Sequence, residues 1–161
     1  NKIKLYRNHG LEGRDRVAMF GINSRLDSLN AEVLSFRLKR LDSIINRRKK
    51  NIEFYRKYLK TNKVVLPKDK SYEINSYVMF IAICENRDGL QTYLSSKNIQ
   101  SLVYYGTPLH LHKASVILGY KKGDFPNAEG ICSKVLALPH HQHLREEEIK
   151  YVCDKINEFY N

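Results

Sequence analysis

The sequence is poor in the residues that stabilise small secreted proteins or anchor a chain in a membrane. Among its 161 residues there is no Trp, and there are only two Met, four Pro and three Cys. No apolar run reaches the roughly 18 residues that a transmembrane helix needs, and no secretory signal is visible, so we expect no membrane association. The chain begins with Asn1 rather than Met, which leaves open whether it is complete, processed or a fragment.

The three cysteines, Cys84, Cys132 and Cys153, are odd in number and far apart in the chain. This pattern argues against a disulfide framework and matches no zinc-ligand spacing. Cys84 falls in an apolar, strand-like run and the other two fall on helical patterns, so we interpret all three as small buried apolar residues. A reducing cytoplasm is the expected location.

Acidic residues are scarce relative to basic ones. The chain has 17 Asp and Glu against 28 Lys and Arg, which gives a formal net charge of +11. A charge of this size is typical of nucleic-acid binding, but no nucleic-acid motif is present, and the basic run 47–50 is interpreted as a solvated helix face. Positive potential would equally suit a doubly anionic small ligand. A non-catalytic basic module that binds nucleic acid or a protein partner remains the alternative function.

Common catalytic and metal-binding signatures are also missing. The sequence contains no GxSxG, P-loop, GxGxxG or CxxC string. The six histidines include a pair two residues apart, His110 and His112, and a cluster at His140, His141 and His143. Zinc ligation by such groups is geometrically possible, but neither group has a neighbouring Cys or a matched acidic ligand pattern. We therefore expect no metal site, and a zinc hydrolase is the weakest alternative.

A long amphipathic stretch organises the sequence. Apolar residues recur at steps dominated by three and four from Leu26 to Leu59, and neither Pro nor Gly occurs between Asp27 and Lys60. The pattern predicts one continuous helix over residues 27–60, roughly 50 Å long at 1.5 Å per residue. A helix of that length usually connects two bodies of structure.

Residues 61–161 have the pattern of a small α/β domain. Short strands are predicted at 64–66, 76–84 and 99–105, and helices at 88–96, 113–118, 127–136 and 145–160. The strand at 76–84 is almost continuously apolar, as expected for a strand that is covered on both faces. The predicted fold class is therefore α/β.

The loop before the long helix allows two interpretations. Asn23 or Ser24 can cap the N-terminus of the helix, and the spacing alone favours this structural role. A helix N-terminus with free amides and a side-chain NH2 group is also an anion site. The two roles are compatible, because Ser24 can cap the helix while Asn23 faces a phosphate.

Five short strings occur in an order that resembles one family. They are RNHG at 7–10, GINSRLD at 21–27, Tyr105 followed by Pro108-Leu109-His110, GY with GDFPNAE across 119–129, and LALP at 136–139. Together they resemble the DegT/DnrJ/EryC1/StrS nucleotide-sugar aminotransferases over nearly the whole chain. The resemblance implies the C-terminal portion of a fold type I aminotransferase. Residues 1–26 would be the edge of the large domain with a cofactor-phosphate loop, 27–60 the long connecting helix, and 61–161 the small C-terminal α/β domain.

The resemblance also implies a reaction. Family members are homodimers that use pyridoxal phosphate to move an amino group from glutamate to a keto sugar on a nucleoside diphosphate, with the cofactor storing the amino group. The lysine that forms the Schiff base lies in the part of the family that precedes the RNHG string. No catalytic residue is therefore assigned to this chain, and by itself it is expected to be inactive.

Residue roles follow from the matched positions. Asn23 matches the asparagine that reaches the cofactor phosphate of the other subunit. Arg25 matches the arginine of the same loop, where a contact to the cofactor and a structural salt bridge are equally open. His110 and Tyr105 match residues on the substrate side of the pocket. The chain departs from the family pattern at Tyr104 and Asn75, where histidine is frequent, which puts substrate details in doubt. The string at 104–112 is most similar to members that act on a 3-keto-6-deoxyhexose.

Overall fold

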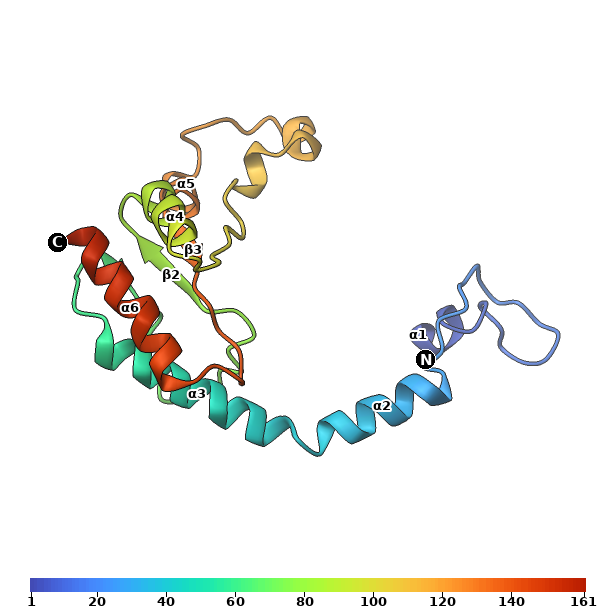
Figure 1. Cartoon of the computed structure of the whole chain (residues 1–161). Helices are drawn as coiled ribbons and strands as arrows, with labels where there is room; N and C mark the ends of the chain where they lie inside the picture. The colour runs from blue at the N-terminus through green and yellow to red at the C-terminus, as the bar shows by residue number, and fades with distance from the viewer. The chain divides into compact units, whose positions relative to one another are not determined.

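The computed structural model describes all residues, 1–161, and divides into two compact units (Figure 1). Unit 1 is Asn1–Asp42 and unit 2 is Ser43–Asn161. No helix combines the length and the apolar content required to cross a membrane.

Unit 1 consists of two helices joined by a loop. Helix α1 (Lys2–Tyr6) leads into residues 7–27, and α2 (Ser28–Leu38) follows. The N-cap of α2 is Asp27, whose Oδ1 accepts a hydrogen bond from the Asn30 backbone N–H at 2.9 Å. This bond lowers the pKa of the Asp27 carboxyl. The predicted cap at Asn23 or Ser24 is therefore wrong, because the helix begins only after Asp27.

The predicted continuous helix over 27–60 is also wrong in one respect. Helix α2 ends at Leu38 and α3 (Leu41–Tyr58) begins after a turn at Lys39 and Arg40, where the Arg40 N–H donates to the Arg37 carbonyl at 3.0 Å. No residue of α2 is buried, whereas α3 buries Asn51, Ile52 and Tyr55. Packing supplies most of the stability of a protein helix, and of these two helices only α3 has it. The turn contains no Pro or Gly, so the sequence carried no local signal for it.

Unit 2 is built on a three-stranded antiparallel sheet in the order β1-β2-β3. The strands are β1 (Val64–Val65), β2 (Ile81–Cys84) and β3 (Val135–Ala137), with Val64 opposite Cys84 and Ala82 opposite Leu136. Helices α4 (Arg87–Ser96) and α6 (Glu146–Tyr160) pack on each other, and α4 also packs on β2 and β3. The core contains side chains from all of these elements and from α3: Ile52, Tyr55, Val64, Ala82, Leu90, Leu94, Leu136, Ile149 and Ile156.

The structure confirms the α/β class and the helices predicted at 88–96 and 145–160, which are α4 and α6. The predicted strands are shorter in the structure than in the prediction. The strand predicted at 76–84 is regular only from Ile81, because Tyr77 has a left-handed φ of 48° that interrupts extended backbone. The strand predicted at 99–105 is reduced to a bridge between Leu102 and Ala137. The segment 113–118 forms the 3-10 helix η2 (Lys113–Leu118).

The helix predicted at 127–136 is wrong at its C-terminal end. Helix α5 (Pro126–Cys132) ends early, and Val135, Leu136 and Ala137 form β3, with all three side chains buried. Pairing with β2 supplies these residues with both backbone partners and burial, which outweighs the helical spacing of the local sequence. Of the cysteines, Cys84 and Cys153 are buried as expected, and Cys132 is half-buried.

Side chains of α3 hold the extended segment that follows β3. The Tyr55 hydroxyl donates to the Pro139 carbonyl at 2.6 Å, Asn51 Nδ2 donates to the His141 carbonyl at 2.9 Å, and Arg47 donates to the Leu144 carbonyl at 3.2 Å. Pro139 has no N–H, so it cannot continue the pairing that Ala137 makes with Leu102. The segment therefore leaves the sheet and is anchored to α3.

We predict that Tyr55→Phe lowers the free energy of unfolding of unit 2 by about 1–3 kcal/mol, because the variant removes the donor of a fully buried side chain from the partly buried Pro139 carbonyl. Urea denaturation or hydrogen exchange of the β3 amides measures the change. Tyr151→Phe is the matched control, since the exposed Tyr151 hydroxyl donates to the Lys97 carbonyl, where water can replace it. Equal losses in the two variants would contradict the anchoring role of Tyr55.

Candidate functional site

The loop of unit 1 is held in shape by its backbone. The Ile22 N–H donates to the Tyr6 carbonyl at 2.8 Å, the His9 N–H to the Ile22 carbonyl at 2.9 Å, and the Ser24 N–H to the Arg7 carbonyl at 2.8 Å. An isolated β-bridge pairs Asn8 with Asn23. These bonds fix the backbone of residues 22–24 and so present the side chain of Asn23 from a defined position.

Two glycines make this close approach possible. A Cβ at Gly21 would lie 2.5 Å from both the Gly10 nitrogen and the Tyr6 carbonyl oxygen. Gly10 has a φ of +72°, and a Cβ there would lie 1.6 Å from the Met19 carbonyl oxygen. Since no L side chain fits either position without movement of the backbone, the glycines of the RNHG and GINSRLD strings are steric requirements of the loop.

Asn23 and Arg25, the predicted cofactor residues, lie together. Arg25 Nε donates to Asn23 Oδ1 at 3.1 Å, and both side chains are exposed. Because the amide oxygen of Asn23 is occupied, its Nδ2 remains as a donor beside a guanidinium group that cannot lose its charge. Asp27, the nearest acid in the sequence, is engaged by Asn30. A donor set of this kind fits an anion such as a phosphate.

The structure also places the two predicted substrate residues in one cavity of unit 2. Tyr105 and His110 line a space of about 880 Å³ formed by residues 103–112 and the α5 region. His110 belongs to the 3-10 helix η1 (Leu109–Leu111). Tyr105 is exposed and has a left-handed φ of 59°, which is uncommon for a bulky residue. Most of the wall is apolar, with Val103, Pro108, Leu109, Phe125 and Ala128 among its members.

A carboxylate holds His110. The distance from His110 Nε2 to Glu129 Oε1 is 3.0 Å, and the Gly123 N–H donates to the same oxygen at 2.8 Å. The two side chains are only 8% and 17% exposed, respectively. The hydrogen bond from Gly123 and the one to His110 lower the pKa of the Glu129 carboxyl. No role was predicted for Glu129 from the sequence. Glu129 and His110 are 19 positions apart, and neither helix nor strand periodicity indicates that residues so far apart are in contact.

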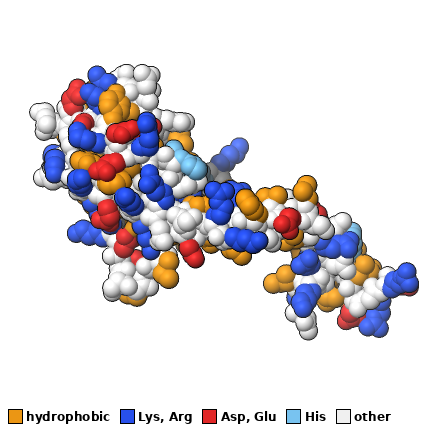
Figure 2. Space-filling view, turned by 60° about the horizontal axis from the view of Figure 1, so that its bottom comes forward, with side chains coloured by type: hydrophobic (Ala, Val, Ile, Leu, Met, Phe, Trp, Pro, Cys, Tyr) orange, Lys and Arg blue, Asp and Glu red, His pale blue; other side chains and the backbone are white.

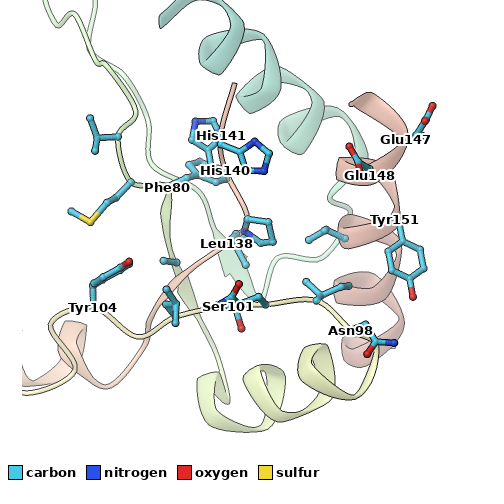
Figure 3. Close-up of a pocket in the computed structure, with 18 residues that line it drawn as sticks. Phe80, Asn98, Ser101, Tyr104, Leu138, His140, His141, Glu147, Glu148 and Tyr151 are labelled. Atoms are coloured by element: carbon cyan, nitrogen blue, oxygen red, sulfur yellow. The ribbon is translucent and has the colours of Figure 1, made fainter. Parts of the chain in front are cut away.

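A second cavity of about 650 Å³ holds none of the predicted site residues (Figure 3). It lies where the segment after β3 diverges from residues 98–102, with Tyr104 at one end and Tyr151 of α6 at the other. Burial lowers the pKa of His140 to about 4, so this ring is neutral near pH 7. No group of three or more His, Cys, Asp or Glu side chains in residues 1–161 is arranged to hold a metal ion.

Comparison with known proteins identifies the same family that the five strings resemble. The model of the DegT/DnrJ/EryC1/StrS aminotransferase family matches residues 1–157. The chain belongs to this family. It is 35% identical to the pleiotropic regulatory protein of Geobacillus stearothermophilus, over 99% of this chain and 44% of that protein. It is 30% identical to the dTDP-3-amino-3,6-dideoxy-alpha-D-galactopyranose transaminase of Aneurinibacillus thermoaerophilus, over 98% of this chain and 43% of that enzyme.

Solved structures confirm the fold. The crystal structure of S. venezuelae DesV in complex with a ketimine intermediate superposes with a TM-score of 0.91 at 31% identity, covering 98% of this chain and 43% of DesV. A family aminotransferase from Brucella abortus gives a TM-score of 0.89 at 30% identity, with 99% and 43% coverage. The chain thus spans less than half of the length of these relatives and corresponds to a C-terminal portion of the fold type I aminotransferase.

We predict that the Gly123 amide reports the ionisation of Glu129. A lowered pKa means that the carboxylate contributes stability above 4.5, the ordinary value, and that this contribution is lost as the pH falls through the lowered value. The Gly123 amide shift in NMR spectra should therefore titrate with a midpoint below 4.5, and Glu129→Gln should abolish the titration. Gly119, whose N–H bonds to the Val116 carbonyl, is the control. An unchanged titration in Glu129→Gln would refute the assignment.

Proposed function

We propose that the full-length protein that carries this chain transfers an amino group from glutamate to a keto-deoxysugar nucleotide with pyridoxal phosphate. The observation that carries the proposal is the match to DesV, which covers 98% of this chain with a TM-score of 0.91. The family membership supports the same reaction class. In this proposal the chain supplies a phosphate contact and part of the sugar pocket, and the lysine that bonds the cofactor is outside it.

The residues of unit 1 suit the phosphate of the cofactor. Asn23 Nδ2 and the guanidinium group of Arg25 would donate to the phosphate oxygens, and the backbone bonds of residues 22–24 would hold Asn23 in place. When bound, pyridoxal phosphate supplies the electron sink that amino-group transfer requires. The homodimer, in which Asn23 serves the other subunit, and the cytoplasmic location are part of the same proposal, as is the assignment of residues 1–26 to the edge of the large domain.

The cavity of unit 2 suits a deoxysugar. Its polar members, among them Tyr105 and His110, can bond hydroxyl groups, while its apolar wall can accept the methyl group that a 6-deoxysugar carries. Relatives act on such sugars: one is the dTDP-3-amino-3,6-dideoxy-alpha-D-galactopyranose transaminase, and another is the dTDP-3-amino-3,4,6-trideoxy-alpha-D-glucose transaminase of Streptomyces venezuelae, which is 31% identical. We propose a 3-keto-6-deoxyhexose on a nucleoside diphosphate as the substrate class.

The positive charge fits this ligand better than it fits a nucleic acid. On the face shown in Figure 2, Lys and Arg alternate with Asp and Glu over unit 2 and do not gather in a single basic stripe. Several bases are in ion pairs, including Arg56 with Asp69 at 3.2 Å and Lys63 with Glu85 at 2.8 Å. A net charge of +11 still attracts a diphosphate over long range.

We predict that Asn23→Ala weakens pyridoxal phosphate binding to the full-length protein about 10- to 100-fold, because a hydrogen bond to a charged group contributes about 1.5–3 kcal/mol. Cofactor absorbance during dialysis measures the loss. Asn46→Ala is the control, since Asn46 is an exposed asparagine on α3 that takes no part in the hydrogen-bond network of the loop. If the two variants retained the cofactor equally well, Asn23 would have no phosphate contact.

A further inference from the structure

We propose that Glu129 is a positioning residue that fixes the tautomer and orientation of His110, so that Nδ1 of His110 accepts a hydrogen bond from a hydroxyl group of the sugar. The positioning rests on the geometry of unit 2 alone. The identity of the donor as a sugar hydroxyl rests on the proposed function.

The position of the Glu129 carboxylate is fixed by hydrogen bonds that do not involve His110. Glu129 lies in the first turn of α5, and its Oε1 accepts from the Gly123 N–H at 2.8 Å. The Glu129 backbone N–H is bonded to the Phe125 carbonyl at 3.0 Å. Because these bonds do not involve His110, Glu129 has a defined position against which the imidazole ring can be oriented.

Aromatic contacts restrict the ring further. The centroid of the His110 ring lies 4.8 Å from that of Phe125 at an interplanar angle of 57°, and Phe125 in turn packs edge-on against Tyr120 at 5.1 Å. The His110 side chain is only 8% exposed. With one face against Phe125 and Nε2 on Glu129 at 3.0 Å, the ring has little freedom to rotate.

The partner of Nε2 determines the chemistry of Nδ1. An ionised carboxylate only accepts hydrogen bonds, so Nε2 must carry a proton. In the neutral ring, Nδ1 is then an acceptor. Nδ1 of His110 has no hydrogen-bond partner in the structure, and it is not among the polar atoms that are both buried and unpartnered. Nδ1 is therefore not fully buried, and His110 lines the cavity. An unpartnered acceptor there selects a ligand that donates, as a hydroxyl does and a keto oxygen does not.

NMR spectra can determine the tautomer of His110 independently of the enzyme's activity. Long-range ¹H–¹⁵N spectra of the full-length protein labelled on histidine report which ring nitrogen is protonated, and His110→Gln assigns the signal. We expect the Nε2–H form in the unmodified protein and in Glu129→Gln, whose amide oxygen can accept from both His110 and Gly123. A mixture of tautomers is expected in Glu129→Ala. An unchanged single tautomer in Glu129→Ala would overturn the positioning.

Kinetics of the full-length enzyme test the use of Nδ1. Glu129→Ala should raise KM for the sugar nucleotide about tenfold, with kcat within about twofold, whereas Glu129→Gln should restore KM and Glu147→Ala, at an exposed first-turn glutamate of α6, should leave it unchanged. In the His110→Gln background, Glu129→Ala should add no further loss, because it acts through His110. Additive losses would overturn the proposal. The spectra require no turnover, so they decide the positioning even if no nucleotide sugar reacts. That result would overturn the proposed function and the sugar hydroxyl as donor, but not the positioning of His110 by Glu129.

Discussion

The hydrogen bonds from α3 to the backbone of residues 139–144 are the constraint on which unit 2 depends. Partly buried carbonyl groups are more stable with donors, and the segment after β3 cannot continue its pairing with residue 102 and its neighbours once Pro139 interrupts it. Tyr55 and Asn51 supply donors from a helix far away in sequence. The same bonds draw the segment away from residues 98–102, which leaves the cavity of Figure 3 between them. They also lead the chain to the start of α6, where the Arg145 N–H bonds to Glu148 Oε2 and begins the helix.

Each of the two candidate sites is built within its own unit. Backbone bonds and two glycines shape the loop that presents Asn23 and Arg25, and every partner in that network lies within residues 1–42. The cavity that contains Tyr105 and His110 is shaped by residues 103–132, with Glu129 joining its two ends. The local geometry of the loop and that of the cavity are therefore each defined within a single unit.

The parts that could be predicted from the sequence are those in which local pattern and tertiary packing agree. Helix α6 has an acidic first turn and a continuous apolar face, and its prediction is correct within one residue. The turn at residues 39–40 could not be found, because it contains neither Pro nor Gly and the local spacing is helical. The β3 strand could not be found, because burial and pairing in the sheet outweigh a local spacing that is also helical. Asn23 was predicted as a phosphate ligand both from its place before a predicted helix and from the family strings, whereas the substrate role of His110 was predicted from the strings alone. Glu129 belongs to one of these strings, yet its role depends on a contact across 19 residues that periodicity does not encode.

The contacts give the five strings a physical meaning. RNHG and GINSRLD meet through the bridge between Asn8 and Asn23, at a separation that only glycine at positions 10 and 21 permits. The segment ending at His110 meets the GDFPNAE segment through Glu129 and Gly123. LALP meets α3 through the Tyr55 hydroxyl. Four of the five strings thus contact one another in two pairs, so a substitution in one string of a pair is expected to disturb the other. This explains why a chain with no conventional catalytic motif still carries a specific chemical signal: the motifs specify how ligand-facing side chains are held, while the bond-making lysine lies elsewhere in the proposed enzyme.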